Sequence, residues 1–348
     1  MNYPAVGGGY RRYPWYPRSN ATGENSFAVK IEVLRNKFSW KAKREKGKAF
    51  FMKYATSKKN KEPVLMVREE STEYSPNKCV FRDDENNAWL YHADCIEFMD
   101  MLIDKYPNGK FDMIFADPPY FLSNGGITCH NGKMVKVDKG QWDKSSGPEL
   151  NHEFNTAWLS RCQKLLNPNG TIWVSGTHHV IHSVGYAMQQ LGLKILNDIT
   201  WEKPNPPPNL SCRYFTHSTE TIIWAAKNEK SKHCFNYKQM RHINAGKQMK
   251  SVWSFKAPNG DEKTFGKHPT QKPVALLERI ILASTNEDDL IYDPFAGSST
   301  TGVAAIKTKR KFVGTELEPA FVGLSISRLQ RAIATRQTSL NFTFSEVI

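Results

Sequence analysis

The chain has 348 residues, 39% of them hydrophobic, and a formal net charge of +14, which fits one α/β domain with an appendage. No apolar run reaches the length of a membrane span and the N-terminus is polar and aromatic, so neither a transmembrane helix nor a signal peptide is expected. The six cysteines form no C-x-x-C pair, which argues against zinc and favours a reduced, cytoplasmic compartment.

The positive charge is concentrated in two segments. Residues 1–82 hold 18 Lys and Arg against 7 Asp and Glu, and residues 227–272 hold 11 against 3. Two basic segments on a slightly acidic body predict two patches that face a polyanion. The alternative is that these lysines are simply solvated.

The first 85 residues are interpreted as a basic extension. Residues 1–25 are rich in Tyr, Pro, Gly and Arg without a period, which predicts an arm that could stack on bases or bind phosphates. Residues 26–85 have mixed signals and no assignable fold. The main domain is expected over 86–348, with its first strand and turn ending near Asp94.

A buried strand followed by an unusual loop comes next. The apolar run at 111–116 predicts a central parallel strand. It is followed by Asp117, Pro118, Pro119 and Tyr120, where the two prolines remove two N–H donors. The resulting rim of acceptors suits the two N–H bonds of a nucleobase amino group, and Tyr120 offers a ring for stacking. The alternative is a proline-rich turn.

The middle of the chain predicts alternating helices and strands. A long loop at 121–150 is placed to close over a base. A helix over 154–166, a strand over 170–175, a helix over 181–191 and two antiparallel strands over 193–201 and 220–225 follow. Adjacent loop histidines usually point apart, so His178 and His179 predict no metal site. Trp201, Tyr214 and Phe215 are interpreted as packing residues.

A second strand–loop–helix unit lies near the C-terminus. After a helix over 274–284, which Pro273 starts, the strand 290–292, the small-residue loop 293–299, the helix 300–308 and the strand 311–316 are expected. Such a loop presents backbone N–H groups and a helix dipole to a ligand. Glu316 stands where a Rossmann-like unit bonds ribose hydroxyls. This loop lacks the G-x-G-x-x-G pattern that dinucleotide-binding sites use. A nucleoside ligand without a pyrophosphate is therefore favoured.

Together these motifs resemble the amino-group DNA methyltransferases that use S-adenosylmethionine, in the permuted order of the β group. The stretches ADPPYFLSNGG, VDKGQWDK, NPPPNLSCRYFTHSTETIIWA, GKHPTQKP and LLERIILAST are similar to the second, single-strand-tolerant adenine methyltransferase of Dpn-type restriction-modification systems, which modifies GATC. The resemblance covers residues 86–336. It implies a Rossmann-like α/β fold, a mostly parallel sheet with an antiparallel edge hairpin, and a target-recognition segment at about 227–267.

The resemblance also implies the site residues. The catalytic set is Asp117, Pro118, Pro119 and Tyr120, with direct transfer of a methyl group to a flipped or single-stranded adenine and no metal. The family's F-x-G-x-G loop is altered in this chain, because Ser299 stands in place of its second glycine. Serine fits a helix-capping role, but it carries a Cβ that would matter if φ is positive at this position. The cofactor set is Asp94, Asp117, Thr270, Lys272, Asp293, Phe295, Ala296, Gly297, Ser298, Ser299, Thr300 and Glu316.

Other functions stay open at this point. Methylation of cytosine N4 uses the same amine chemistry, and a DNA-binding protein on a decayed methyltransferase fold is a non-enzymatic alternative. Modification of RNA or protein glutamine is disfavoured by Asp at 117. The expected partner is DNA, double-stranded and also single-stranded, with no membrane. A homodimer is compatible with the sequence.

Overall fold

The structure is a computed structural model, which describes residues 39–45, 48–54, 77–123, 127–130, 133–136 and 143–345. The chain divides into two compact units, Met1–Ser71 and Thr72–Ile348. In the first, β1 (Ser39–Glu45) and β2 (Lys48–Tyr54) form an antiparallel hairpin. The expected arm at 1–25 lies outside the described residues.

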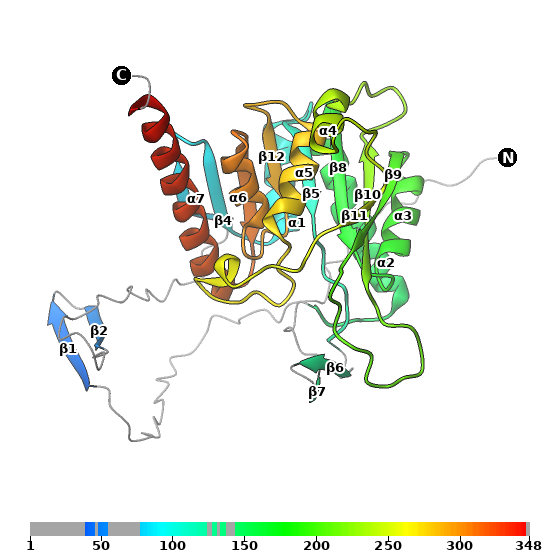
Figure 1. Ribbon diagram of the computed structural model, residues 1–348. Coiled ribbons are helices and arrows are strands. Elements are labelled where there is room, and N and C mark those ends of the chain that lie inside the picture. The colour runs from blue at the N-terminus through cyan, green and yellow to red at the C-terminus, as the bar shows by residue number, and fades with distance from the viewer. Residues whose placement is uncertain are drawn as a thin grey trace, which may run out of the picture. The chain divides into compact units, whose positions relative to one another are not determined.

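The second unit is built on a nine-stranded sheet with the order β11-β9-β10-β8-β5-β12-β13-β4-β3 (Figure 1). Strands β8, β5, β12, β13 and β4 run parallel. The hairpin β9–β10 and the edge strand β3 add antiparallel pairs, which confirms the expected fold class. The strands are β3 (Lys78–Asp83), β4 (Ala88–His92), β5 (Phe111–Ala116), β8 (Leu166–Gly176), β9 (Lys194–Glu202), β10 (Thr219–Ala226), β11 (Val252–Ser254), β12 (Leu290–Asp293) and β13 (Lys311–Glu316).

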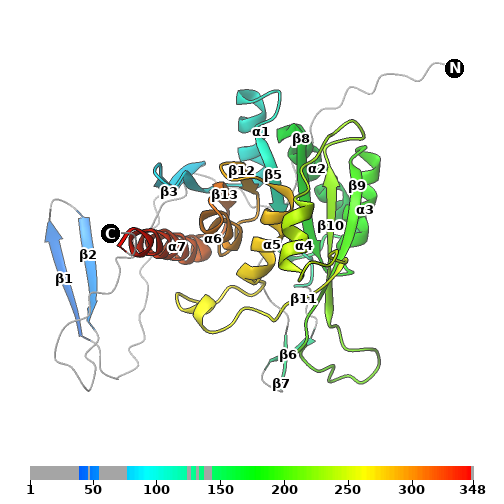
Figure 2. The same ribbon diagram turned by 45° about the horizontal axis from the view of Figure 1, so that its top comes forward.

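Helices cover both faces of this sheet (Figure 2). One hydrophobic core lies under α1 (Cys95–Lys105), α2 (Pro148–Leu165) and α3 (Ile181–Gln190). The other lies under α5 (Val274–Ser284), α6 (Thr300–Lys307) and α7 (Pro319–Ser345), with the short α4 (Tyr237–Ile243) against α5. A sheet buried on both faces explains the continuous apolar runs of β5 and β8. In the described part, no helix is long and apolar enough to cross a membrane.

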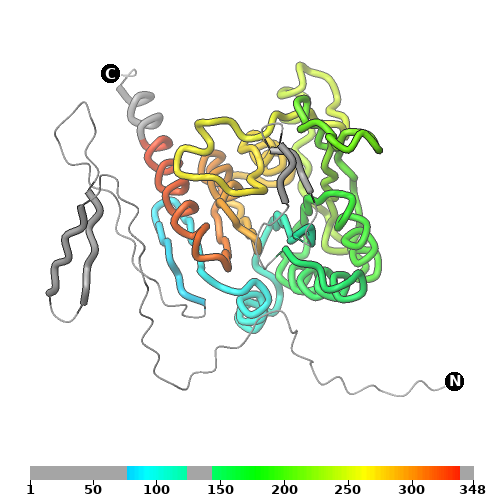
Figure 3. The backbone as a smooth tube through the Cα atoms, turned by 90° about the horizontal axis from the view of Figure 1, so that it is seen from below, coloured from blue at the N-terminus to red at the C-terminus, as the bar shows by residue number. Residues whose placement is uncertain are grey.

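Strand order brings distant segments together at one edge. β5 and β12 are neighbours in the sheet, with Met113 opposite Ile291, although about 180 residues separate them in the chain. Because they are parallel, the residues after both strands leave the sheet at the same edge, which Figure 3 views from below. We call this the carboxyl edge. It is where ligands bind in open α/β sheets.

The expected elements from 111 to 316 are present, but α2 begins at Pro148, within the expected loop 121–150, and β8 begins four residues earlier than expected. Several features were not anticipated. β3 lies before residue 86 yet pairs with β4, so the sheet begins earlier than the expected boundary. The segment 227–267 contains α4 and β11, and α7 follows the last strand. A second small hairpin, β6 (Ile127–His130) with β7 (Lys133–Lys136), lies within the long loop at 121–150.

Candidate active site

The loop after β5 is held in shape by one buried aspartate. Asp143 is fully buried, and its Oδ1 accepts hydrogen bonds from the backbone N–H groups of Tyr120 and Phe121, both at 2.9 Å. Its Oδ2 accepts from the Leu122 N–H at 3.2 Å and from the Ser123 hydroxyl at 2.9 Å. These donors follow two prolines that can donate nothing. Asp143 therefore fixes the path of the chain directly after Asp117-Pro118-Pro119.

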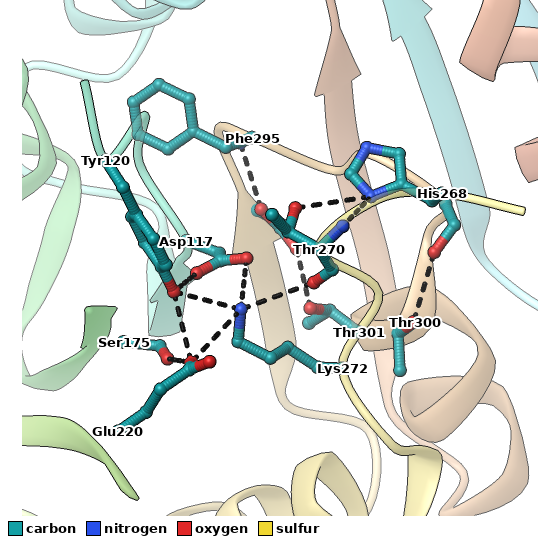
Figure 4. Close-up of polar contacts among 12 residues, drawn as sticks. Asp117, Tyr120, Ser175, Glu220, His268, Thr270, Lys272, Phe295, Thr300 and Thr301 are labelled. Atoms are coloured by element: carbon teal, nitrogen blue, oxygen red, sulfur yellow. Dashed lines mark hydrogen bonds and ion pairs between the residues drawn. The ribbon is translucent and has the colours of Figure 1, made fainter. Parts of the chain in front are cut away.

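Polar side chains from two further segments, β10 and the stretch before α5, gather around Asp117 and Tyr120 (Figure 4). The Tyr120 hydroxyl donates to Asp117 Oδ1 at 2.6 Å, and Lys272 Nζ donates to Asp117 Oδ2 at 2.5 Å. Lys272 Nζ also lies 3.0 Å from the Tyr120 hydroxyl and 3.6 Å from Glu220 Oε2. Glu220, on β10, is in turn paired with Lys203. The loop after β5 is thus not lined by hydrogen-bond acceptors alone, because the Lys272 ammonium group lies against it.

The charges of this cluster depend on one another. Burial raises the pKa of Asp117, and Lys272 opposes that rise. Burial would also raise the pKa of Glu220, but Lys272 and Lys203 outweigh it and lower that pKa to about 2. Burial would lower the pKa of Lys272, yet Asp117 and Glu220 raise it. Lys272, together with Lys203 at Glu220, therefore supplies the positive charge that offsets the burial of these carboxylates.

The Tyr120 ring does not present an exposed face on which a base could stack. Its side chain is only 4% exposed and its hydroxyl is tied into the cluster. A base can stack on this ring only after the ring is uncovered.

The small-residue loop after β12 is organised by Asp293. Its Oδ1 accepts from the Phe295 N–H at 2.9 Å and its Oδ2 from the Thr301 hydroxyl at 2.6 Å. Burial raises the pKa of Asp293 to about 7, against these two hydrogen bonds. Asp293 thus ties the strand end to the first turn of α6. Ala296 is also buried in this loop, where its N–H donates to Thr315 O at 2.9 Å.

Gly297 and Glu316 are joined directly. The Gly297 N–H donates to Glu316 Oε2 at 2.7 Å, and the Glu318 N–H donates to Oε1 at 2.7 Å. Gly297 has φ +54°, and a Cβ there would lie 3.1 Å from the His268 ring, so both the backbone conformation and the tight space favour glycine. Burial raises the pKa of Glu316 to about 8, despite the two N–H donors. Each carboxylate oxygen still has a second lone pair for a hydroxyl donor.

Ser299 adopts the left-handed conformation, with φ +53° and ψ +38°. The expected capping role is wrong: its side chain makes no capping hydrogen bond, and its buried hydroxyl has no partner among the described residues. The positive φ that the sequence analysis considered for this position is confirmed. Its neighbours are well bonded, because Arg328 on α7 donates to the Ser298 hydroxyl at 2.8 Å and to the Thr300 hydroxyl at 2.9 Å.

Two further residues expected near the cofactor lie at the same edge. Asp94 caps α1 by accepting from the N–H groups of Ile96 and Glu97, and the preceding Ala93 N–H donates to Glu316 O at 3.0 Å. The Thr270 N–H and hydroxyl both lie 3.3 Å from His268 Nδ1. Lys272, expected in the cofactor set, donates from its ammonium group to Asp117 (Figure 4).

Sequence reasoning missed Asp143, Glu220, Lys203 and Arg328. The stretches VDKGQWDK and STETIIWA were noted, but nothing in their spacing shows that Asp143 and Glu220 reach the loop after β5. A charged residue inside an otherwise apolar strand was the available signal for Glu220, since such residues are seldom buried without a partner.

The family model described as DNA methylase matches residues 111–327. Among curated proteins, the chain is 55% identical to the Type II methyltransferase M2.LlaDCHI of Lactococcus lactis subsp. cremoris, covering 71% of this chain and 91% of that protein. It is 54% identical to the Type II methyltransferase M2.DpnII of Streptococcus pneumoniae (71% and 91%) and 51% identical to M2.MboI of Moraxella bovis (72% and 90%).

Solved structures show the same architecture. The M1.HpyAVI–SAM complex matches with a TM-score of 0.54 and 31% identity, covering 70% of this chain and 98% of that one. The cytosine-N4-specific PvuII DNA methyltransferase matches with a TM-score of 0.55 and 19% identity, covering 70% and 86%; at this identity the likeness concerns the fold alone.

Proposed function

Since the chain belongs to the DNA methylase family, we propose that it methylates the N6 amino group of adenine in DNA, as the modification enzyme of a restriction-modification system. S-adenosylmethionine is the methyl donor, in keeping with the SAM complex of M1.HpyAVI. The proposed target sequence is GATC, from the resemblance to Dpn-type enzymes. The observation that carries this proposal is the ion pair of Asp117, whose side chain is 13% exposed, with the buried Lys272 at the edge where β5 and β12 end together.

The residues of the carboxyl edge fit the cofactor. Glu316 has lone pairs for the ribose hydroxyls, and Gly297 lacks the Cβ that would lie 3.1 Å from the His268 ring. Asp94 and Thr270 flank this region, and the loop Asp293–Thr300 leads into α6. When bound, S-adenosylmethionine supplies a methyl group on a positively charged sulfur. We assign Lys272 to the catalytic cluster, because its ammonium contacts Asp117 and Tyr120.

The chain's own groups prepare the amine. Asp117 and the Pro118 carbonyl accept the two N–H bonds, which localises the nitrogen lone pair for attack on the methyl group. Lys272 opposes the rise in the pKa of Asp117 that burial causes, and Asp143 holds the loop so that both acceptors stay in place. Tyr120 stacks on the base once DNA binding uncovers its ring. Positioning and preorganised charge supply most of the acceleration.

DNA is the proposed partner, bound by the basic segments. We assign DNA recognition to the second half of the segment 227–267, because the chain after β11 leaves the sheet at the carboxyl edge. There the Phe255 N–H donates to Glu202 O. The segment starting at Lys227 leaves β10 at the opposite edge, where its N–H donates to Gly170 O. Action on single strands, a homodimer and an intracellular location are further parts of the proposal.

The test is expression in a host without DNA methylation, followed by sequencing with modified-base detection. N6-methyladenine within GATC is expected from the wild-type protein. Asp117→Ala should abolish transfer of a tritiated methyl group and leave DNA binding nearly intact, because the carboxylate acts on the amine. Asp100→Ala is the matched control, since Asp100 is an exposed carboxylate paired with Arg161 on another helix. Methylated cytosine, or full turnover by Asp117→Ala, would refute the assignment.

A further inference from the structure

The loop between β9 and β10, residues 203–218, lies beside the Asp117 cluster. β10 begins opposite the end of β8, with Thr221 paired to Gly176. The loop therefore extends from the carboxyl edge (Figure 1). Its two ends carry members of the cluster, Lys203 and Glu220. Whatever this loop binds lies next to the amine-binding site.

The loop is internally ordered. Asn209 Oδ1 accepts from the Ser211 N–H at 3.0 Å, and Asn209 Nδ2 donates to Tyr214 O at 2.6 Å. Three successive prolines, 206–208, restrict the preceding backbone. The two ends of the loop are joined by a hydrogen bond from the Lys203 N–H to Ser218 O at 2.7 Å. The side chains at its tip are thus presented on a shaped scaffold.

Its tip exposes large apolar side chains. Phe215 is 95% exposed and Tyr214 60%, whereas Trp201 is 2% exposed. The expectation that all three are packing residues is therefore correct for Trp201 and wrong for the other two. An ordered loop that holds an aromatic ring almost wholly in water presents a surface for a partner.

The rings beside this tip form a row of contacts that spans two loops, in which His178 and His217 are stacked and the other two pairs are tilted. Tyr214 and His217 have centroids 5.3 Å apart, and His217 stacks on His178 at 4.9 Å. His178 and His179 follow at 3.8 Å, so these adjacent histidines converge, contrary to expectation. No cluster of metal-binding side chains occurs among the described residues, which leaves stacking as the feature to be explained.

The charge of this surface suits a polyanion. The loop 203–218 contains Arg213 and Lys203 and no Asp or Glu, and the segment 176–182 contains three histidines and no acid. Arg213 is exposed. An exposed cation, Arg213, beside exposed aromatic rings on a loop without acidic residues is a combination found in sites that hold unpaired nucleotides.

We propose that Tyr214 and Phe215 stack on the nucleotides flanking the target base when the DNA is single-stranded. This inference rests on the proposed function and assigns a substrate form to it. The loop that carries these rings is flanked by Lys203 and Glu220, so a strand whose target base occupies the Asp117 cluster would pass beside it. Stacking tolerates any base sequence, so this surface adds affinity for an unpaired strand without adding specificity.

The test measures binding of a labelled single-stranded oligonucleotide containing the target sequence, and of its duplex, by fluorescence anisotropy. Phe215→Ala should weaken single-strand binding by about tenfold, the range for one lost base–aromatic stack, and Tyr214→Ala by a similar factor. Duplex binding should change by less than about twofold. The nearly complete exposure of Phe215 means that its loss should leave folding and S-adenosylmethionine affinity, measured by calorimetry, unchanged.

Phe235→Ala is the matched control. Phe235 is 47% exposed and follows β10 at the edge opposite Asp117, so single-strand binding should stay at the wild-type level. Unchanged single-strand binding in both Phe215→Ala and Tyr214→Ala would overturn the inference, as would a larger loss with duplex than with single strand. A wild-type protein that methylates no DNA would refute the proposed function instead, and the two failures are therefore distinct.

Discussion

Replacing Ser299 by glycine should stabilise this protein, because two features of the residue are unfavourable. Its backbone has φ +53°, and its fully buried hydroxyl has no hydrogen-bond partner among the described residues. A non-glycine residue in the left-handed region costs about 1–2 kcal/mol. A buried hydroxyl without a partner costs about 1–3 kcal/mol.

Two effects oppose this gain. Glycine loses more conformational freedom on folding, which costs about 0.5–1 kcal/mol, and the lost Cβ removes about 0.8 kcal/mol of burial. The net expectation for Ser299→Gly is a gain of about 1–2 kcal/mol in the free energy of unfolding. Ser299→Ala keeps the strained φ and removes only the hydroxyl, so the expected gain in the free energy of unfolding is about 1 kcal/mol.

The assay is urea unfolding together with thermal melting, for which each kcal/mol raises the midpoint by about 2–4 °C in a domain of this size. The matched control is Ser298→Ala. Ser298 is also buried, but its hydroxyl accepts from the Arg328 guanidinium at 2.8 Å, so the same change should cost about 1.5–3 kcal/mol. S-adenosylmethionine affinity of Ser299→Gly should be unchanged or improved.

The reasoning about backbone strain would be refuted by a Ser299→Gly protein less stable than the wild type. Ser299→Ala and Ser298→Ala shifting in the same direction would refute the reasoning about the hydroxyl.

Three further predictions concern the loop after β5, the cofactor carboxylate and the basic arm. Asp143→Ala removes the acceptor of four hydrogen bonds in that loop, so methyl transfer should fall by at least about tenfold while S-adenosylmethionine affinity, measured by calorimetry, stays constant. The pKa of Glu316 is raised to about 8, so its contribution to stability is fully present below its unfolded pKa and is lost as pH rises through 8; Glu316→Gln should flatten the decline in urea midpoint between pH 5 and 9, which is at most about 1.4 kcal/mol per pH unit for one proton. Deleting residues 1–25 should weaken DNA binding and reduce the slope of log K against log salt, and an identical slope in the truncated protein would contradict a role for the arm.

The local pattern of residues was enough to predict much of this protein. Apolar runs at 111–116 and 290–292, ended by Pro-Pro and by a small-residue loop, predicted two central strands and their loops, because strand periodicity and turn chemistry are properties of neighbouring residues. The motifs at Asp117 and Asp293–Gly297 then predicted the family. The edge strand β3 was missed because its partly exposed pattern lacks the apolar signal of a central strand.

Only the tertiary structure decided how the site is assembled. Lys272 and Glu220 lie more than 100 residues from Asp117 in the chain, and they meet it because β10 and the segment before α5 both reach the carboxyl edge (Figure 4). The role of Asp143, the left-handed backbone of Ser299 and the exposure of Phe215 also depend on the packing of segments far apart in sequence. Such contacts follow from strand order and side-chain packing, and no local pattern of residues encodes them.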